Sequence, residues 1–114
     1  MAVKRFTIRS YSIKLGDAMT ATWGGVQIKA RGIVACRGTD HRFLAYFLTE
    51  DSPVPDSVYI EANKVGAIFC PFEEMSAYVD LVRNEKPIYA YLNSAKPEWN
   101  NLSTSQEPIG EEES

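Results

Sequence analysis

The chain contains few of the residues on which metal sites and most enzyme mechanisms depend. Its 114 residues include one histidine, His41, and two cysteines, Cys36 and Cys70. A lone histidine, with two cysteines far apart in sequence, lacks the ligand spacing of a zinc site, so we expect no metal and no cofactor. Because both cysteines lie in apolar runs, "GIVACRG" and "VGAIFCPF", we expect them to be buried free thiols.

Sequence motifs for nucleophilic catalysis and for phosphate binding are also absent. Nothing resembles the strand–turn–helix segment that carries a catalytic serine. The glycines of "WGGVQ" are not followed by the lysine of a phosphate-binding loop. We therefore expect a protein that is not an enzyme, and we keep a small cofactor-independent pocket enzyme as an alternative.

Long hydrophobic runs are missing as well. No apolar run approaches the ~18 residues that a membrane span needs, and residues 1–12 hold no apolar segment of signal-peptide length. We therefore expect a cytoplasmic protein that does not interact with a membrane.

The net charge is low but unevenly distributed. The formal charge is −3, made up of +6 over residues 1–42 and −9 over residues 43–114. Such asymmetry is typical of a basic binding surface followed by an acidic segment. A neutral sheet followed by an acidic tail gives the same count, and we keep both interpretations.

What the chain has in quantity is apolar sequence with the alternation of β-strands. Hydrophobic residues make up 45% of the chain, enough for one core in one domain. The pattern predicts an α+β fold, with a strongly coiled, mainly antiparallel sheet of five to six strands that forms a partial barrel. We expect one helix near 71–84, a globular domain over 1–93, and a flexible or extended acidic tail over 94–114.

The expected coiling of the sheet comes from two places where the alternation changes face. One lies near Arg9–Ser10 and the other at Gly24–Gly25, and each predicts a bulge or a sharp bend within a strand. Between them, Leu15-Gly16-Asp17 has the composition of a turn.

The helix is expected to be structural. Pro71 suits a first helical position, and the acidic residues that follow it suit the positive end of the helix dipole. Apolar residues then recur at the three-and-four spacing of one buried helix face, which predicts burial of Phe72, Met75, Tyr78, Val79 and Val82.

Aromatic side chains are the best candidates for a ligand site. A coiled sheet with one helix across its mouth can enclose a pocket lined by such residues. The candidates are Trp23, Tyr46 and Tyr59, together with Glu61, an outward-facing glutamate suited to a cationic ligand.

A homodimer follows from the size of the expected sheet. A helix is ~10 Å wide and strands lie ~4.8 Å apart, so one helix covers only two or three strands. A second copy, packed face to face or along an edge, would cover the rest, and our first functional hypothesis is a homodimeric, non-catalytic binding or assembly module. Tyr89, Tyr91 and Trp99 are the interface candidates. In the competing interpretation, Trp99 folds back over both tyrosines in a monomer.

Basic residues interleave with aromatic residues in the first third of the chain. Arg5 and Arg9 share one face of the first expected strand, and Lys29 and Arg31 share one face of the second. If the two strands pair, these residues form a cationic patch suited to single-stranded nucleic acid, which is the alternative function. In the competing interpretation, they only keep the sheet surface solvated and block edge pairing.

Overall fold

The protein is described here from a computed structural model, in which residues 2–104 are described. The acidic end of the expected tail, residues 105–114, lies outside the described residues. None of the helices within residues 2–104 has the length and apolar character needed to cross a membrane.

The described chain is mostly β-strand. Its strands are β1 (Val3–Thr7), β2 (Ser10–Trp23), β3 (Val26–Arg37), β4 (Arg42–Leu48), β5 (Val58–Ile60), β6 (Val65–Pro71), β7 (Ile88–Asn93) and β8 (Asn101–Thr104). Its helices are α1 (Met75–Asn84) and three short 3-10 helices, η1 (Glu61–Asn63), η2 (Phe72–Glu74) and η3 (Pro97–Trp99).

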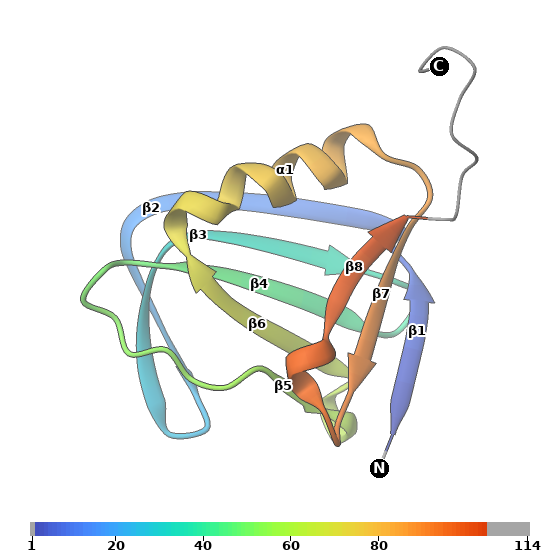
Figure 1. Ribbon diagram of the computed structural model, residues 1–114, viewed down its shortest axis with the longest axis horizontal. Helices are drawn as coiled ribbons and strands as arrows, with labels where there is room; N and C mark the ends of the chain where they lie inside the picture. The colour runs from blue at the N-terminus through green and yellow to red at the C-terminus, as the bar shows by residue number, and fades with distance from the viewer. Residues whose placement is uncertain (1, 105–114) are drawn as a thin grey trace.

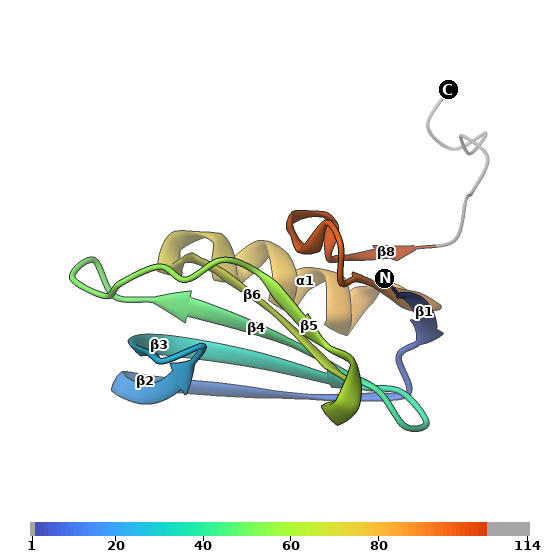
Figure 2. The same ribbon diagram turned by 90° about the horizontal axis from the view of Figure 1, so that it is seen from below.

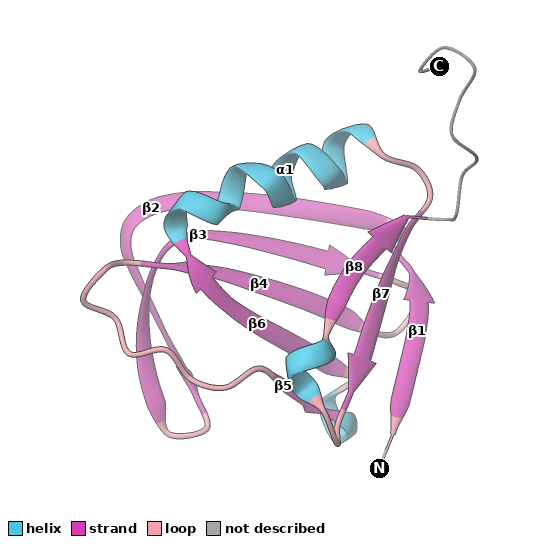
Figure 3. Ribbon diagram, in the orientation of Figure 1, coloured by secondary structure: helices cyan, strands magenta, loops and turns pink. Residues whose placement is uncertain are grey.

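The strands form two sheets. The large sheet has the order β2-β3-β4-β6-β5, and the small sheet has the order β1-β7-β8. All neighbouring strands are antiparallel except β4 and β6. Helix α1 runs along one face of the large sheet, and the small sheet stands beside the C-terminal end of α1 (Figure 1 and Figure 2). The α+β class and the mainly antiparallel pairing are thus confirmed, but the large sheet is open and three strands belong to a second sheet (Figure 3).

The change of face near Arg9–Ser10 marks a passage between the two sheets. The N–H of Ile8 donates to the carbonyl of Ile88 in the small sheet (2.9 Å), and the N–H of Arg9 donates to the carbonyl of Arg37 in the large sheet (2.7 Å). The position of the bend was therefore predictable, whereas its cause, a change of sheet, was not.

The change of face at Gly24–Gly25 is a hairpin turn, and the expected bulge within a strand is wrong. Gly24 and Gly25 have φ of 57° and 81°. Two consecutive residues with positive φ form the tight turn that best matches the twist of a hairpin. The β2–β3 hairpin is bent elsewhere, by register shifts in the β2–β3 pairing between Leu15 and Met19 and in the β3–β4 pairing between Ala30 and Gly32. The expected turn at residues 15–17 is one of these bends.

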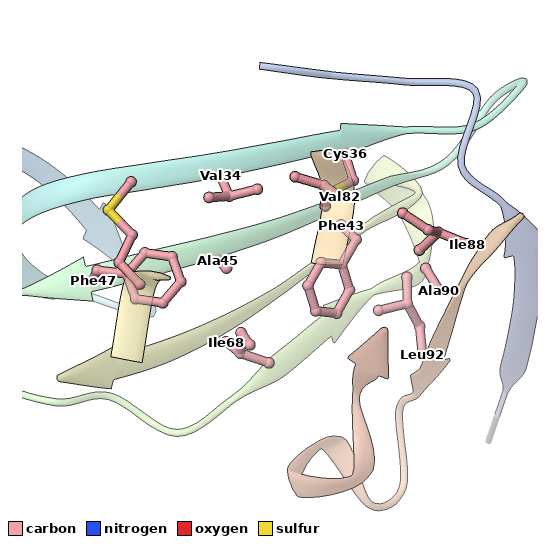
Figure 4. Packing of buried hydrophobic residues seen from close by; sticks show 11 residues of the cluster. Val34, Cys36, Phe43, Ala45, Phe47, Ile68, Val82, Ile88, Ala90 and Leu92 are labelled. Atoms are coloured by element: carbon pink, nitrogen blue, oxygen red, sulfur yellow. The ribbon is translucent and has the colours of Figure 1, made fainter. Parts of the chain in front are cut away.

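The main core lies between the large sheet on one side and α1 with the small sheet on the other (Figure 4). Met75 and Val82 of α1 are buried, and the other three predicted helix residues are partly buried against the same core, so the predicted helix face is confirmed. The remaining buried residues of this cluster are Val34, Cys36, Phe43, Ala45, Phe47, Ile68, Ile88, Ala90 and Leu92.

The ordered domain extends beyond the expected boundary at residue 93. Strand β8 pairs with β7, and Asn100, which precedes it, is buried. The Asn100 side chain accepts a hydrogen bond from the N–H of Asn93 (2.9 Å) and donates one to the carbonyl of Val58 (2.9 Å), which ties the small sheet to β5. The expectation of a tail starting at residue 94 is therefore wrong, because η3 follows that point and β8 completes the second sheet.

Candidate functional site

Two of the four ligand-site candidates meet in an aromatic cluster on the face of the large sheet opposite α1. Tyr46 on β4 and Phe69 on β6 are neighbours across the parallel pair, and their rings stack at 5.5 Å between centroids. The indole of Trp23 meets Tyr46 edge-on at 5.7 Å and Phe69 at 6.0 Å. Phe69 was not singled out, because a phenylalanine in an apolar run gives no signal in the sequence.

An open cleft of about 610 Å³ lies beside Trp23. It separates the tip of the β2–β3 hairpin from the loop before β5, and apolar side chains, including Val54, Val58 and Ile60, line it. The loop is anchored by Ser52, whose hydroxyl accepts a hydrogen bond from the N–H of Lys29 (2.9 Å). The cleft is therefore an open hollow with a largely apolar wall.

The other two ligand-site candidates lie elsewhere. Tyr59 pairs with Gly66 of β6 and directly follows Val58, so its side chain points to the face of β5 opposite the cleft. Glu61 is exposed at the start of η1. The four candidates therefore do not line one pocket.

Tyr59 takes part in a polar chain with His41 and Asp40. The Nδ1–H of His41 donates to Asp40 at 2.7 Å, and the Tyr59 hydroxyl lies 3.3 Å from His41 Nε2. The hydrogen bond from His41, with a weaker contribution from Lys64, holds the pKa of Asp40 below its usual range. Burial, with the nearby charges of Glu61 and Asp40, raises the pKa of Tyr59, so its phenol stays protonated at neutral pH.

The hydrogen-bonded group of Asp40, His41 and Tyr59 connects separate parts of the fold. Because the Tyr59 phenol is not activated as a nucleophile, we assign these three side chains no catalytic role. The buried His41 ring also packs against Phe6 of β1, with 5.5 Å between ring centroids. It thereby joins the turn before β4 to β5 and to the small sheet.

The outer face of the small sheet gathers all three interface candidates. We call this surface the outer platform, and its residues are Arg5, Thr7, Tyr89, Tyr91, Lys96, Trp99, Asn101 and Ser103. Tyr89 and Tyr91 lie on the face of β7 opposite the buried residues, as predicted. The Arg5 guanidinium lies 4.1 Å from the centroid of the Tyr89 ring, and the Lys96 ammonium lies 4.7 Å from that of Trp99. A shallow concavity of about 500 Å³ includes Arg5, Tyr91 and Trp99 in its wall.

Trp99 does not cover the two tyrosines as a lid. It lines the concavity together with Tyr91 but is itself 55% exposed. Lys96, Asn101 and Ser103 were missed because β8 was not predicted. The available signal was "NLST", in which an apolar residue alternates with polar ones after a tight segment.

The four nucleic-acid candidates are not brought together. Only Arg5 lies on the outer platform. Arg9 donates a hydrogen bond to the Thr39 hydroxyl (3.0 Å), Lys29 forms an exposed ion pair with Asp51 (3.3 Å), and the Arg31 guanidinium lies over the Phe72 ring at 4.3 Å. The expectation of one cationic patch is wrong, because β1 pairs with β7 and not with the strand that carries Lys29 and Arg31.

A third surface lies along β2, which is an edge strand of the large sheet. We call it the β2 groove. It is an open cavity of about 460 Å³ between β2 and α1, lined by Ile13, Leu15, Phe72, Met75 and Val79 and by the polar residues Glu73, Ser76, Asp80 and Arg83. Leu15 is 70% exposed, and Tyr11 on the same face of β2 is 42% exposed. The sequence pattern missed this surface because Leu15 was assigned to a turn.

The thiols and acidic residues form no recognisable site in the described part of the chain. Burial raises the pKa of the Cys36 thiol to about 12, and it also raises that of Cys70. Among residues 2–104, no three His, Cys, Asp or Glu side chains lie close enough together to hold a metal ion.

Comparisons with known proteins give no match. No protein-family model, no curated protein and no solved structure matches the chain. The functional conclusions therefore come from the surfaces described above.

Proposed function

We propose that the protein is a non-catalytic binding module that acts as a homodimer, joined through β2, which is an edge strand of the large sheet. The observation that carries the proposal is a self-complementary arrangement. One part is the exposed side chains of β2. The other is a polar stripe along η2 and α1, made up of Glu73, Ser76, Asp80 and Arg83. Both match their own copies when two molecules meet edge to edge.

The β2 strand supplies the apolar part of the contact. Tyr11, Ile13 and Leu15 alternate along the strand and share the face that carries α1. When two β2 strands pair antiparallel with Ile13 at the centre, Leu15 of each copy lies opposite Tyr11 of the other. Such aromatic–aliphatic pairs stabilise neighbouring strands, and the backbone groups of the edge gain hydrogen-bond partners.

Helix α1 and β2 run in opposite directions, and this aligns their centres. Leu15 is the strand neighbour of Gly32, over which Met75 packs, so the start of α1 lies near Leu15. Tyr11 and Val82 line one concavity, so the end of α1 lies near Tyr11. The middle of the helix, at residues 78–79, is therefore level with Ile13 along the strand direction.

The polar stripe along η2 and α1 is symmetric about the same point. Edge pairing of this kind has a twofold axis perpendicular to the sheet, so both helices lie on one face and run antiparallel. Glu73 then faces Arg83 of the second copy, and Ser76 faces Asp80 of the second copy. With α1 over β3 and strands ~4.8 Å apart, the helix axes would lie roughly 14 Å apart, within reach of long side chains.

The size of this contact predicts a dimer of moderate strength. Residues 10–16 span roughly 23 Å, and the sheet and helix layers together are roughly 20 Å thick, which gives roughly 900 Å² buried over both copies. That area is typical of weak, exchanging complexes, so we expect a micromolar dissociation constant. The outer platform is smaller, at roughly 14 by 17 Å, and we therefore do not place the dimer contact at Tyr89 and Tyr91.

The cleft beside Trp23 is the proposed place for a small apolar ligand in the same module. Its apolar wall and aromatic neighbours are the features that such ligands use. Quenching of Trp23 fluorescence by a small apolar probe, measured with Trp99 replaced by Phe, tests this part of the proposal. No quenching at any soluble probe concentration would refute it.

Sedimentation equilibrium of two matched variants tests the dimer. Leu15 and Val54 are both 70% exposed, but only Leu15 lies at the proposed contact. We expect Leu15→Asp to weaken the dimer at least tenfold, because it places a charge opposite Tyr11 at both ends of the apolar contact. Val54→Asp should dimerise like the unchanged protein. Equal effects of the two substitutions would contradict the proposed interface.

A further inference from the structure

We infer that the outer platform binds a short stretch of single-stranded nucleic acid. This inference goes beyond the proposed dimer and is independent of it, because the outer platform and the β2 groove share no residue. It assigns a ligand class to the surface where three interface candidates and Arg5 come together.

The platform is a regular grid of side chains that can stack and donate hydrogen bonds. Strand register places Arg5, Tyr91 and Asn101 in one row across the small sheet. Thr7, Tyr89 and Ser103 form the next row. The Tyr91 hydroxyl accepts a hydrogen bond from the Asn93 side chain (3.0 Å), which fixes the ring before any ligand arrives. Trp99 closes one side of the grid.

The spacing of the grid favours a single strand over a duplex. Tyr89 and Tyr91 are two residues apart on one strand, so their rings are roughly 7 Å apart. This is about twice the ~3.4 Å rise between stacked bases of a duplex strand. Only unstacked bases can therefore lie on successive platform positions. Aromatic rings and the flat guanidinium of Arg5 both accept such bases by stacking.

The charge of the surface favours an anionic ligand over a neutral sugar. Arg5 and Lys96 each lie over an aromatic ring of the platform. A base that stacks on the Arg5 guanidinium, or on the Tyr91 ring beside it, therefore places its phosphate near a positive charge. Glu98 is the only acidic residue within β1, β7, η3 and β8 of the described chain. In sequence, four glutamates follow β8, within residues 105–114, and a chain ending at Thr104 has a formal charge of +1 in place of −3.

Two cationic contacts imply a modest salt dependence. Each phosphate contact on a single strand contributes a slope of about −0.7 to the logarithmic dependence of affinity on salt. With two contacts, the affinity should fall about sevenfold between ~50 and ~200 mM salt. Ending the chain at Thr104 should raise the affinity at low salt, because it removes negative charge without removing a platform residue.

Fluorescence anisotropy with a labelled oligothymidylate of about eight nucleotides at ~50 mM salt tests the inference. Tyr91→Ala and Arg5→Gln should each weaken binding about 5- to 150-fold. Trp99→Ala serves if Tyr91→Ala does not fold, because Trp99 is largely exposed. Arg31→Gln is the matched control, since Arg31 also lies over an aromatic ring, at 4.3 Å, but belongs to β3 of the large sheet and not to the platform. It should bind like the unchanged protein.

Several outcomes would overturn the inference. The unchanged protein could fail to bind the oligothymidylate at ~50 mM salt, or Arg31→Gln could lose as much affinity as the platform variants. The protein could also bind the matching duplex with equal affinity, or bind a neutral oligosaccharide on the same residues with no dependence on salt. Sedimentation of the platform variants separates this result from the dimer proposal, because their self-association should be unchanged.

Discussion

The side chain of Met75 packs directly against Gly32, so that a Cβ added at Gly32 would meet the Met75 sulfur. This contact brings the first turn of α1 close to β3. It fixes the height of the helix above the large sheet and the distance of its polar stripe from the β2 edge. A glycine in the middle of a strand is otherwise unfavourable, so its value at this position is the close approach that it permits.

Substitution of Gly32 tests this contact. Gly32→Ala should lower the free energy of unfolding by about 1–3 kcal/mol, because the added methyl group displaces the Met75 side chain from a packed core. Urea unfolding of Gly32→Ala, Met75→Ala and the double variant gives the coupling between the two sites. The double variant should lose less than the sum of the single changes, and strict additivity would show that the residues do not compete for the same space.

Truncation tests the extended boundary of the domain. A chain that ends at Thr104 should unfold at the same urea concentration as the full chain, because it keeps every described element. A chain that ends at Asn93 loses β8 and both hydrogen bonds of the Asn100 side chain, which leaves buried groups of Asn93 and Val58 without partners. It should lose several kcal/mol or fail to fold. Equal stability of the two truncated chains would show that the folded domain ends at residue 93.

The buried thiol of Cys36 predicts a loss of stability in alkali. Its pKa is raised by burial from 9.0 to about 12. Between these values the unfolded chain loses the thiol proton while the folded chain keeps it, so stability is full below pH 9 and falls as the pH rises. The expected loss from Cys36 is roughly 1.5 kcal/mol between pH 9 and about pH 10.5.

The pH dependence of a variant isolates this effect. Cys36→Ala should unfold with a correspondingly smaller fall in stability over the same pH interval, although it is less stable throughout because of the space that it leaves. Tyr78, whose pKa burial raises to about 12, should contribute to the remaining decline in both proteins, together with Cys70 and Tyr59, whose pKa values burial also raises. Parallel pH profiles for the two proteins would show that Cys36 is not the titrating group.

Local patterns in the sequence predicted the elements better than their assembly. The spacing around Met75 and Val82 and the flanking prolines specified the helix, because these signals act within a few residues. The pairing of β1 with β7 joins residues more than 80 positions apart, and no local pattern encodes it. The change of face after Ile8 showed where the chain bends but not that it enters a different sheet.

The candidate sites followed the same division. Tyr89 and Tyr91 were placed on the correct face of their strand, because alternation within one strand is a local property. The partners of that face, Lys96, Asn101 and Ser103, depend on the pairing of β8 and were missed. Arg5 and Lys29 were grouped wrongly for the same reason, since a shared patch requires that their strands be neighbours.

A charge exchange across the twofold axis tests the dimer most directly. Glu73→Lys and Arg83→Glu should each weaken self-association in sedimentation equilibrium, because each places like charges opposite one another in the antiparallel helix pair. The double variant restores opposite charges in reversed order, and we predict that it dimerises with nearly the affinity of the unchanged protein. A double variant that associates no better than the single variants, or an unchanged protein that stays monomeric at several hundred micromolar, would contradict the homodimer joined through β2.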